Sequence, residues 1–408
     1  MRKSRAEGGK IGLSEDSPRT SAREPRPRGS SRQLRLLMVS FCNAINSDSP
    51  RAIRTRVLAA SLGAEWVVSR SGSPVARGSR RAGWRGPARV VARRLHPWLF
   101  VDRFEPTARR WATGWQPDGD AALLIGYPFS PLAFASKKLL AAEIPYVLDL
   151  GDPWALTAAA PLIHGLARLR ARRMEAEMLS GAAGVIVTTE GQATSLRNLL
   201  PTTPILVQPN GLSESELVCK GPVSSRSQPE NFLRLAHFGQ VHAARIQIGD
   251  HLRGLLSSGA FQSVELHQYG TISDGQLRNL PAAVQLVTHA SVLRSEMAKL
   301  AAQYDGVLAI GNLDPQQMPS KVIDYCALPA PRVAFVGKLA DDSIADFVRD
   351  KPGWLVVSAA TPNMAAVVWE HLRRDWSAEQ LAAPPSLGWL VAVEEIQRFL
   401  RAALEGRE

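Results

Sequence analysis

The residues best suited by type and spacing to do chemistry lie in residues 318–335, MPSKVIDYCALPAPRVAF. Pro319 and Ser320 are typical of the first turn and the cap of a helix, and Lys321 follows them. A helix start attracts phosphate through its free N–H groups and dipole, and Lys321 adds a full charge. Asp324 lies one turn further on the same face, where a carboxylate can accept hydrogen bonds from sugar hydroxyls. The pattern indicates a site for a diphosphate and a ribose; an ordinary capped helix is the alternative.

A second basic residue points to the same ligand. Residues 235–247 read LAHFGQVHAARIQ, in which a strand ends at Gly239 and Arg245 is predicted to begin a helix after a loop. Arginine is the preferred bidentate ligand of phosphate. We therefore predict that Arg245 and Lys321 bind one diphosphate, the alternative being a solvent-facing arginine in a first helical turn.

Three further polar residues follow predicted strands. Asp152 comes after the strand of residues 145–150 and is expected either near an acceptor or at the cap of the next helix. His289 and Ser291 end another strand, where they either pack against a nucleoside or form a plain turn.

No Asp-x-Asp metal motif is evident, and the cysteines are too few and scattered for a disulfide framework or a zinc site: Cys42, Cys219 and Cys326. No metal is expected.

Alternating strands and helices must position these residues. Apolar strands are predicted in the first half at residues 34–41, 65–69, 121–125, 145–150, 184–188 and 205–208. Those of the second half are predicted at 233–238, 263–269, 284–289, 306–310, 332–336 and 353–357. Buried strands that alternate with helices imply parallel sheets covered on both faces. We predict an α/β protein of two doubly wound, Rossmann-like domains facing across a cleft, with ligands beyond the carboxyl ends of the strands.

The length of 408 residues suggests two or three domains. Residues 1–33, rich in Arg, Ser, Pro and Gly, are predicted to be a disordered basic tail. The first domain is predicted at 34–215, a linker at 216–230 and the second domain at 231–386. Residues 387–408 are predicted to form an amphipathic helix that packs back on the first domain.

The net charge of +12 is concentrated in residues 35–110, which carry fifteen Lys or Arg and four Asp or Glu. Between residues 77 and 115 the arginines are mixed with tryptophan, leucine and phenylalanine. That mixture suits contact with an anionic membrane surface, whereas a solvated loop is the alternative. The residues assigned to this acceptor or membrane side are Arg85, Arg89, Arg93, Arg94 and Trp98.

Other partners and locations are disfavoured. No nucleic-acid-binding signature accompanies the charge, so no nucleic acid is expected. No apolar stretch approaches the roughly 18–20 residues of a membrane span, and the first residues lack the apolar core of a secretory signal. We expect a cytoplasmic protein, located at the inner face of the plasma membrane.

Six segments, in order, carry a likeness to a known family: residues 144–154 (IPYVLDLGDPW), 182–200 (AAGVIVTTEGQATSLRNLL), 207–212 (VQPNGL), HFGQV with Arg245, 266–270 (LHQYG) and 319–325 (PSKVIDY). Over about residues 34–404 the chain resembles the GT-B fold nucleotide-sugar glycosyltransferases, close to family 4 of the retaining enzymes. The resemblance implies a donor site of Gly239, Arg245, Gly270, His289, Ser291, Gln316, Ser320, Lys321 and Asp324.

The chain departs from that family at three places. The family's Glu-x7-Glu pair is replaced by Gln316 and Asp324, of which the first faces the donor sugar and the second holds the ribose. Glutamine can donate or accept a hydrogen bond there, but it supplies no negative charge. The glycine pair that commonly follows the first strand is missing, and Gly151 stands where many relatives have His or Arg.

The resemblance implies transfer of a sugar, with retention, from a nucleoside-diphosphate sugar to a glycan or lipid-linked acceptor, as in synthesis of a cell-surface polysaccharide. The donor is then a substrate, and no cofactor is expected. Catalytic roles fall on Asp152, Arg245 and Lys321, the two cations stabilising charge on the departing diphosphate. Two alternatives share the fold: a nucleotide-sugar 2-epimerase, whose pattern of acid and His residues is not found, and a non-catalytic nucleotide- or partner-binding protein, which Gln316 keeps open.

Overall fold

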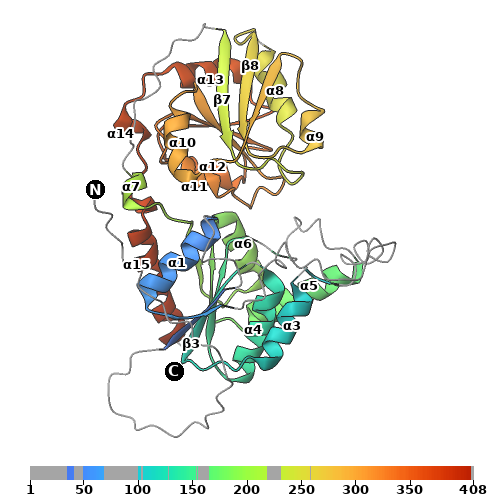
Figure 1. Cartoon of the computed structure of the whole chain (residues 1–408), viewed down its shortest axis with the longest axis vertical. Helices are drawn as coiled ribbons and strands as arrows, with labels where there is room; N and C mark the ends of the chain where they lie inside the picture. Colours follow the sequence, from blue (N-terminus) through green and yellow to red (C-terminus); the bar gives the residue numbers. More distant parts are fainter. Residues whose placement is uncertain are drawn as a thin grey trace, which may run out of the picture. The chain divides into compact units, whose positions relative to one another are not determined.

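Short runs of buried apolar residues form the strands of two separate parallel sheets (Figure 1). The computed structural model describes residues 35–40, 49–68, 100–102, 104–126, 128–152, 154, 165–217, 231–257 and 259–405. The predicted tail and most of the predicted linker lie outside these residues. The described residues all belong to one compact unit, Arg35–Glu408.

The first sheet has six strands in the order β2-β1-β3-β4-β5-β6, all parallel. Because β2 and β3 pair with opposite edges of β1, the strand order reverses between β1 and β3. The strands are β1 (Leu36–Ser40), β2 (Glu65–Val68), β3 (Ala121–Ile125), β4 (Tyr146–Leu150), β5 (Gly184–Val187) and β6 (Ile205–Val207). The described helices of this half are α1 (Pro50–Leu62), α3 (Glu105–Gly114), α4 (Phe129–Ala141), α5 (Gly165–Ser180), α6 (Glu190–Leu199) and the short α7 (Glu214–Leu217).

The second sheet also has six parallel strands, in the order β12-β11-β10-β7-β8-β9. Its strand order reverses between β7 and β10, and ligands of such sheets bind beyond the strand ends at this switch point. The strands are β7 (Phe232–Phe238), β8 (Ser263–Tyr269), β9 (Val284–His289), β10 (Gly306–Ile310), β11 (Arg332–Val336) and β12 (Trp354–Ser358). The helices are α8 (Ile248–Leu256), α9 (Asp274–Leu277), α10 (Arg294–Ala301), α11 (Lys321–Tyr325), α12 (Ser343–Val348), α13 (Met364–Arg373), α14 (Ala378–Leu381), the 3-10 helix η2 (Pro385–Leu387) and α15 (Trp389–Glu405).

Both faces of the first sheet are buried because successive strand residues point to opposite sides. Leu37 and Val39 pack with α4 and α5 on one face, whereas Leu36 and Met38 pack on the other. The second face is covered by α1 and by the terminal helix α15, whose Ile396 is fully buried. Figure 1 shows α15, in red, beside the blue α1, and the backbone pairs at Leu212 with Trp389 where α15 begins.

A buried arginine fixes the helix that carries Lys321 and Asp324. Arg332, on β11, is 1% exposed and donates to the carbonyl oxygens of Tyr325, Cys326 and Leu328 at the end of α11. These bonds satisfy carbonyl groups that a helix end leaves without intrahelical partners. The position of α11 therefore depends on the second sheet itself.

The predicted fold class is confirmed, and every predicted strand is present to within about two residues. No helix among the described residues is long and apolar enough to span a membrane.

Candidate functional site

The carboxyl ends of β7, β8 and β9 form a narrow cradle of backbone. Gly239 follows β7 with φ 147°, and its N–H donates to the carbonyl oxygen of Tyr269 at 2.9 Å. Gly270 follows β8 with φ 125°, and a Cβ there would lie 2.3 Å from the carbonyl oxygen of Gly239. The same Cβ would lie 3.5 Å from Oγ of Ser291, after β9. Only glycine fits this close approach, which brings the ends of the three strands together.

Two cations adjoin this cradle. Cγ of Lys321 lies 3.7 Å from the position of a Cβ on Gly239. His237, at the end of β7, is buried, and burial lowers its pKa to about 3, with further lowering by Arg245 and Lys321. The positive charges of Arg245 and Lys321 therefore both disfavour protonation of His237. The structure brings Gly239, Gly270, Arg245 and Lys321 together at the switch point of the second sheet.

Arg245 connects the segment after β7 with the end of β10, the two strands of that switch point. It forms an isolated bridge with Asn312, which follows β10, and its Nη1 donates to the carbonyl oxygen of Ile310 at 3.0 Å and to Oδ1 of Asn312 at 2.8 Å. Burial lowers the pKa of Arg245. Among the described residues it makes no ion pair, and its buried Nε has no hydrogen-bond partner. The expectation that Arg245 begins a helix was wrong, because α8 begins at Ile248 and the bridge to Asn312 holds Arg245 extended.

The helix expected to bind phosphate is short. α11 has only five residues, Lys321–Tyr325, and the residue before it, Ser320, has helical dihedrals and makes no side-chain cap. The predicted capping by Ser320 is therefore wrong, since a capping side chain requires an extended backbone. So short a helix has a small dipole, and Lys321 supplies most of the positive charge here.

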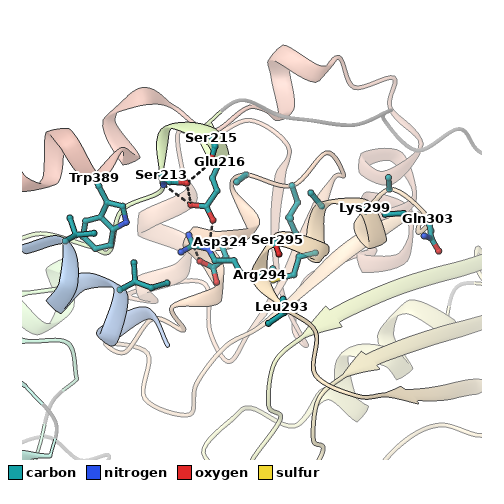
Figure 2. Close-up of a pocket in the computed structure, with 17 residues that line it drawn as sticks. Ser213, Ser215, Glu216, Leu293, Arg294, Ser295, Lys299, Gln303, Asp324 and Trp389 are labelled. Carbon is teal, nitrogen blue, oxygen red and sulfur yellow. Dashed lines mark hydrogen bonds and ion pairs between the residues drawn. The ribbon is translucent and has the colours of Figure 1, made fainter. Parts of the chain in front are cut away.

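Asp324 is buried within a chain of ion pairs. Its Oδ1 lies 2.9 Å from Nη2 of Arg294, and its Oδ2 lies 3.1 Å from Nζ of Lys321. Arg294 also contacts Glu216 at 2.8 Å, so it lies between the two carboxylates (Figure 2). This group lines a largely apolar cavity of about 960 Å³, whose walls include Leu293 and α10. The carboxylate of Asp324 is thus held in one orientation next to Lys321.

His289 and Ser291 lie where the sequence placed them, at the end of β9. The ring of His289 stacks on Tyr269 with centroids 4.3 Å apart, and its Nε2 lies 2.9 Å from Nδ1 of His267. The other ring nitrogen of His267, Nε2, lies 2.7 Å from Oε1 of Glu265. The ring of His289 is thus stacked between those of Tyr269 and His267.

Gln316 contacts the first half of the chain. Its Oε1 accepts from Ser195 at 2.9 Å, and its carbonyl oxygen accepts from Thr189 at 2.7 Å. Its neighbour Gln317 instead lines a second cavity and donates to Asp152 at 2.9 Å. The structure thus shows Gln316 in contact with α6, and its role of facing the donor sugar stays a prediction.

The second cavity, of about 530 Å³, contains Asp152, Arg245 and Ser320. It also contains residues whose part in a site was not predicted from the sequence, namely Arg51, Arg54, Asp149, His242, Asn312 and Gln317. Asp149 lies in residues 144–154 (IPYVLDLGDPW), one of the six segments that carry the family likeness, so the sequence held a usable signal for it. Arg51 and Arg54 could not be told from the other arginines of residues 35–110. The five residues assigned to the membrane or acceptor side, Arg85, Arg89, Arg93, Arg94 and Trp98, lie outside the described residues.

Among the described residues, no group of three or more His, Cys, Asp or Glu side chains is arranged to hold a metal ion. Arg245 and Lys321 at the second switch point are cations that suit an anionic ligand, and Lys321 also pairs with the carboxylate of Asp324.

Known structures share this architecture. Anabaena HepE, solved with UDP and glucose, matches with a TM-score of 0.57 at 12% identity, over 91% of this chain and 100% of that one. The chain has the GT-B fold. Sucrose-phosphate synthase from Thermosynechococcus elongatus matches with a TM-score of 0.52 at 13% identity, over 92% and 100% of the two chains. A glycosyltransferase from Rickettsia africae matches with a TM-score of 0.50 at 10% identity, over 91% and 99%.

No family model and no curated protein sequence matches this chain. This chain thus has the GT-B fold although it shares few residues with those structures. Charged residues lie beyond the carboxyl ends of the strands in both sheets of this GT-B chain: Arg51 and Asp152 at the first sheet, and Arg245 and Lys321 at the second.

Proposed function

We propose that the chain is a glycosyltransferase that moves a sugar from a nucleoside-diphosphate sugar to a glycan or lipid-linked acceptor. The observation that carries this is the cradle of Gly239 and Gly270 with Arg245 and Lys321 at the switch point of a GT-B sheet. A backbone cradle with two converging cations suits a diphosphate. The structures of HepE with UDP, and with UDP and glucose, support this choice of ligand.

In the proposed reaction the bond between the anomeric carbon and the diphosphate oxygen breaks, and its electron pair stays on the diphosphate. Arg245 and Lys321 stabilise that growing negative charge. The acceptor oxygen bonds to the anomeric carbon, and its proton passes to the leaving phosphate. We propose retention of configuration, which rests on the likeness to family 4.

Asp324 is proposed to bind the ribose. Its carboxylate is buried, negatively charged and oriented by Arg294 and Lys321. The stacked rings of Tyr269 and His289 lie on the same edge of the sheet and are proposed to bound the nucleoside. Asp324 also lines the large cavity shown in Figure 2.

A thermal-shift panel with UDP, GDP, ADP, TDP and CMP tests the donor site. A ligand that binds only the native state, at about 100 times its Kd, adds about 2.7 kcal/mol of stability. One nucleotide that alone raises the Tm supports the site and selects the donors to assay for transfer. No shift with any nucleotide contradicts the proposal.

Replacing either cation tests the roles assigned to them. Arg245→Ala and Lys321→Ala should each weaken binding of the selected nucleotide by about 1–3 kcal/mol, because a charge-assisted hydrogen bond is lost. Isothermal titration calorimetry measures the change, and the exposed Lys338→Ala serves as the control. Unchanged affinity in both variants removes Arg245 and Lys321 from the site.

A second candidate function is binding of a nucleotide without catalysis. The observation in its favour is Gln316, which replaces a carboxylate and contacts Ser195. Hydrolysis of the donor without acceptor indicates the transferase, whereas nucleotide binding with neither hydrolysis nor transfer indicates the non-catalytic protein.

The place of action proposed is the inner face of the plasma membrane, in synthesis of a cell-surface polysaccharide. The support is the basic and aromatic composition of residues 77–115.

A further inference from the structure

Four charged side chains of alternating sign form a continuous chain of ion pairs at the cavity of about 960 Å³. They are Glu216 on α7, Arg294 at the start of α10, and Asp324 and Lys321 on α11, and Figure 2 shows Arg294 between the two carboxylates. Lys299, further along α10, is the other charged side chain that lines this cavity, and it is exposed. The chain of ion pairs itself carries no net charge.

Asp324 has one carboxylate oxygen with unused hydrogen-bonding capacity. The residue is 5% exposed, and Nζ of Lys321 lies 3.1 Å from its Oδ2. Even so, Oδ2 accepts no hydrogen bond from a described residue, and Nη2 of Arg294 donates none. Buried polar atoms in proteins nearly all have hydrogen-bond partners. An acceptor without one in a cavity wall suits a ligand hydroxyl, which can donate to it.

The sharing of Arg294 between two carboxylates keeps that oxygen open. A guanidinium that faces one carboxylate commonly bonds both of its oxygens through two parallel N–H groups. Here Nε of Arg294 lies 2.8 Å from Oε1 of Glu216, and Nη2 lies 2.9 Å from Oδ1 of Asp324. Without Glu216, Nε and Nη2 could bond both oxygens of Asp324 and leave neither for a ligand.

Glu216 is itself held in place. Its Oε2 accepts from the backbone N–H of Ser213 at 2.8 Å and from the Ser213 hydroxyl at 2.7 Å, which directs Oε1 to Arg294. The next residue, Leu217, packs against the hydrophobic core that includes Val322 on α11. The carboxylate of Glu216 is therefore fixed relative to the helix that carries Asp324.

We propose that Glu216, acting through Arg294, keeps Oδ2 of Asp324 open to a ribose hydroxyl and so sets the preference of the donor site for nucleotides with an intact ribose. This inference rests on the proposed function, in which Asp324 binds the ribose and Lys321 the diphosphate. When Lys321 faces the diphosphate, Arg294 remains as the counter-charge of the buried carboxylate. Glu216 and Arg294 are positioning residues, because they act on the nucleotide through Asp324.

Isothermal titration calorimetry on the full chain tests this preference. The nucleotide selected by thermal shift is compared with its 2′,3′-dideoxy form, which lacks the hydroxyls. The wild type should bind the intact nucleotide about tenfold or more tightly than the dideoxy form, as expected for a hydrogen bond to a charged group. Glu216→Ala should reduce this ratio to less than about threefold, because Arg294 then bonds both oxygens of Asp324. The Kd for the dideoxy form should stay within about twofold, since Lys321 and Arg245 are unchanged.

A double variant shows whether Glu216 acts through Arg294. In an Arg294→Met background, adding Glu216→Ala should change the ratio by less than about twofold, because Glu216 then has no guanidinium to hold. If Arg294→Met does not fold, Arg294→Lys takes its place, since an ammonium lacks the paired N–H groups of a guanidinium. Lys299→Gln, which removes a charge from the same helix and cavity, is the matched control and should keep the wild-type ratio. Thermal melts show which variants are folded.

The outcomes separate this inference from the proposed function. If the wild type binds the nucleotide and does not distinguish the dideoxy form, the inference is overturned and the diphosphate site stands. The same holds if a folded Glu216→Ala keeps the wild-type ratio, or if Glu216→Ala lowers the ratio equally with and without Arg294. If the wild type binds no nucleotide, the proposed function fails, and the inference fails with it.

Discussion

At the scale of single residues, the cradle depends on the absence of one side chain. Gly270→Ala would place a Cβ 2.3 Å from the carbonyl oxygen of Gly239, at a φ of 125° that L residues rarely adopt. The strand ends must then separate, and we expect nucleotide affinity to fall at least tenfold, by about 1.4 kcal/mol or more. Calorimetric titration measures this, with Gly275→Ala, where a Cβ meets nothing within 4 Å, as the control. Equal affinities in the two variants would contradict the cradle.

His237 gives the second switch point a defined pH response. Gln268 donates to the carbonyl oxygen of Gly239 through Nε2, so its Oε1 accepts and Nδ1 of His237 carries the proton. Burial lowers the pKa of His237 to about 3, whereas an unfolded His titrates near 6.5. The unfolded state therefore binds the extra proton first as the pH falls. The stability associated with neutral His237 is fully present above pH 6.5 and is lost progressively toward pH 3.

Chemical denaturation at pH 7 and pH 5 tests this response. His237 alone should lower the free energy of unfolding by about 2 kcal/mol between these values. His237→Asn lacks this contribution. The difference in the free energy of unfolding between the wild type and this variant should therefore be about 2 kcal/mol smaller at pH 5 than at pH 7. Other histidines are common to both proteins and cancel. If the free energies of unfolding of the two proteins change in parallel with pH, then His237 can be protonated in the folded protein with an ordinary pKa, or the wild type opens locally around His237.

At the scale of elements, strands were predictable and helix ends were not. Buried parallel strands are short apolar runs, so their pattern stands out, as in Ala121–Ile125 and Arg332–Val336. The start of α11 and the environment of Arg245 depend on contacts between segments distant in sequence, namely Arg332 with α11 and Asn312 with Arg245. Cap and helix preferences at single positions carry too little energy to decide against such contacts.

The residues of the candidate site also include some that could be predicted from the sequence and some that could not. Lys321, Asp324 and Arg245 were predicted because local patterns marked them, and the structure brings Lys321 into contact with Asp324. The pair of Arg54 and Asp149 was not predicted, since it joins residues 95 positions apart through the packing of α1 on the first sheet. Sequence patterns report neighbours along an element, whereas this pair depends on how two elements meet.

The terminal helix α15 should contribute to the stability of the first sheet. Ile396 is fully buried among Leu36, Met38 and Leu58, so Ile396→Ala leaves a cavity there. We expect a loss of about 2–4 kcal/mol in the free energy of unfolding. Leu390→Ala, on the same helix at a side chain 65% exposed, should change it by less than about 0.5 kcal/mol. Denaturant unfolding compares them, and equal effects would mean that α15 does not cover the sheet in solution.

At the scale of the whole molecule, the uneven charge makes association with a membrane testable. Residues 35–110 carry a net charge of +11, and a basic residue near an anionic surface contributes about 1 kcal/mol. We expect the full chain to sediment with vesicles of 30% phosphatidylserine in phosphatidylcholine at low salt. It should sediment little with phosphatidylcholine alone, and 0.5 M salt should release it because the Debye length is then shorter than at physiological ionic strength.

Charge removal separates a specific surface from net charge. Changing Arg85, Arg89, Arg93 and Arg94 to Gln should weaken vesicle binding by about 4 kcal/mol, roughly a thousandfold. The matched control removes four exposed arginines elsewhere: Arg278, Arg349, Arg398 and Arg401. If both quadruple variants lose binding equally, the attraction belongs to the total charge of the protein and the proposed membrane side is wrong. If only the first loses it, residues 85–94 direct the chain to the surface on which a lipid-linked acceptor would lie.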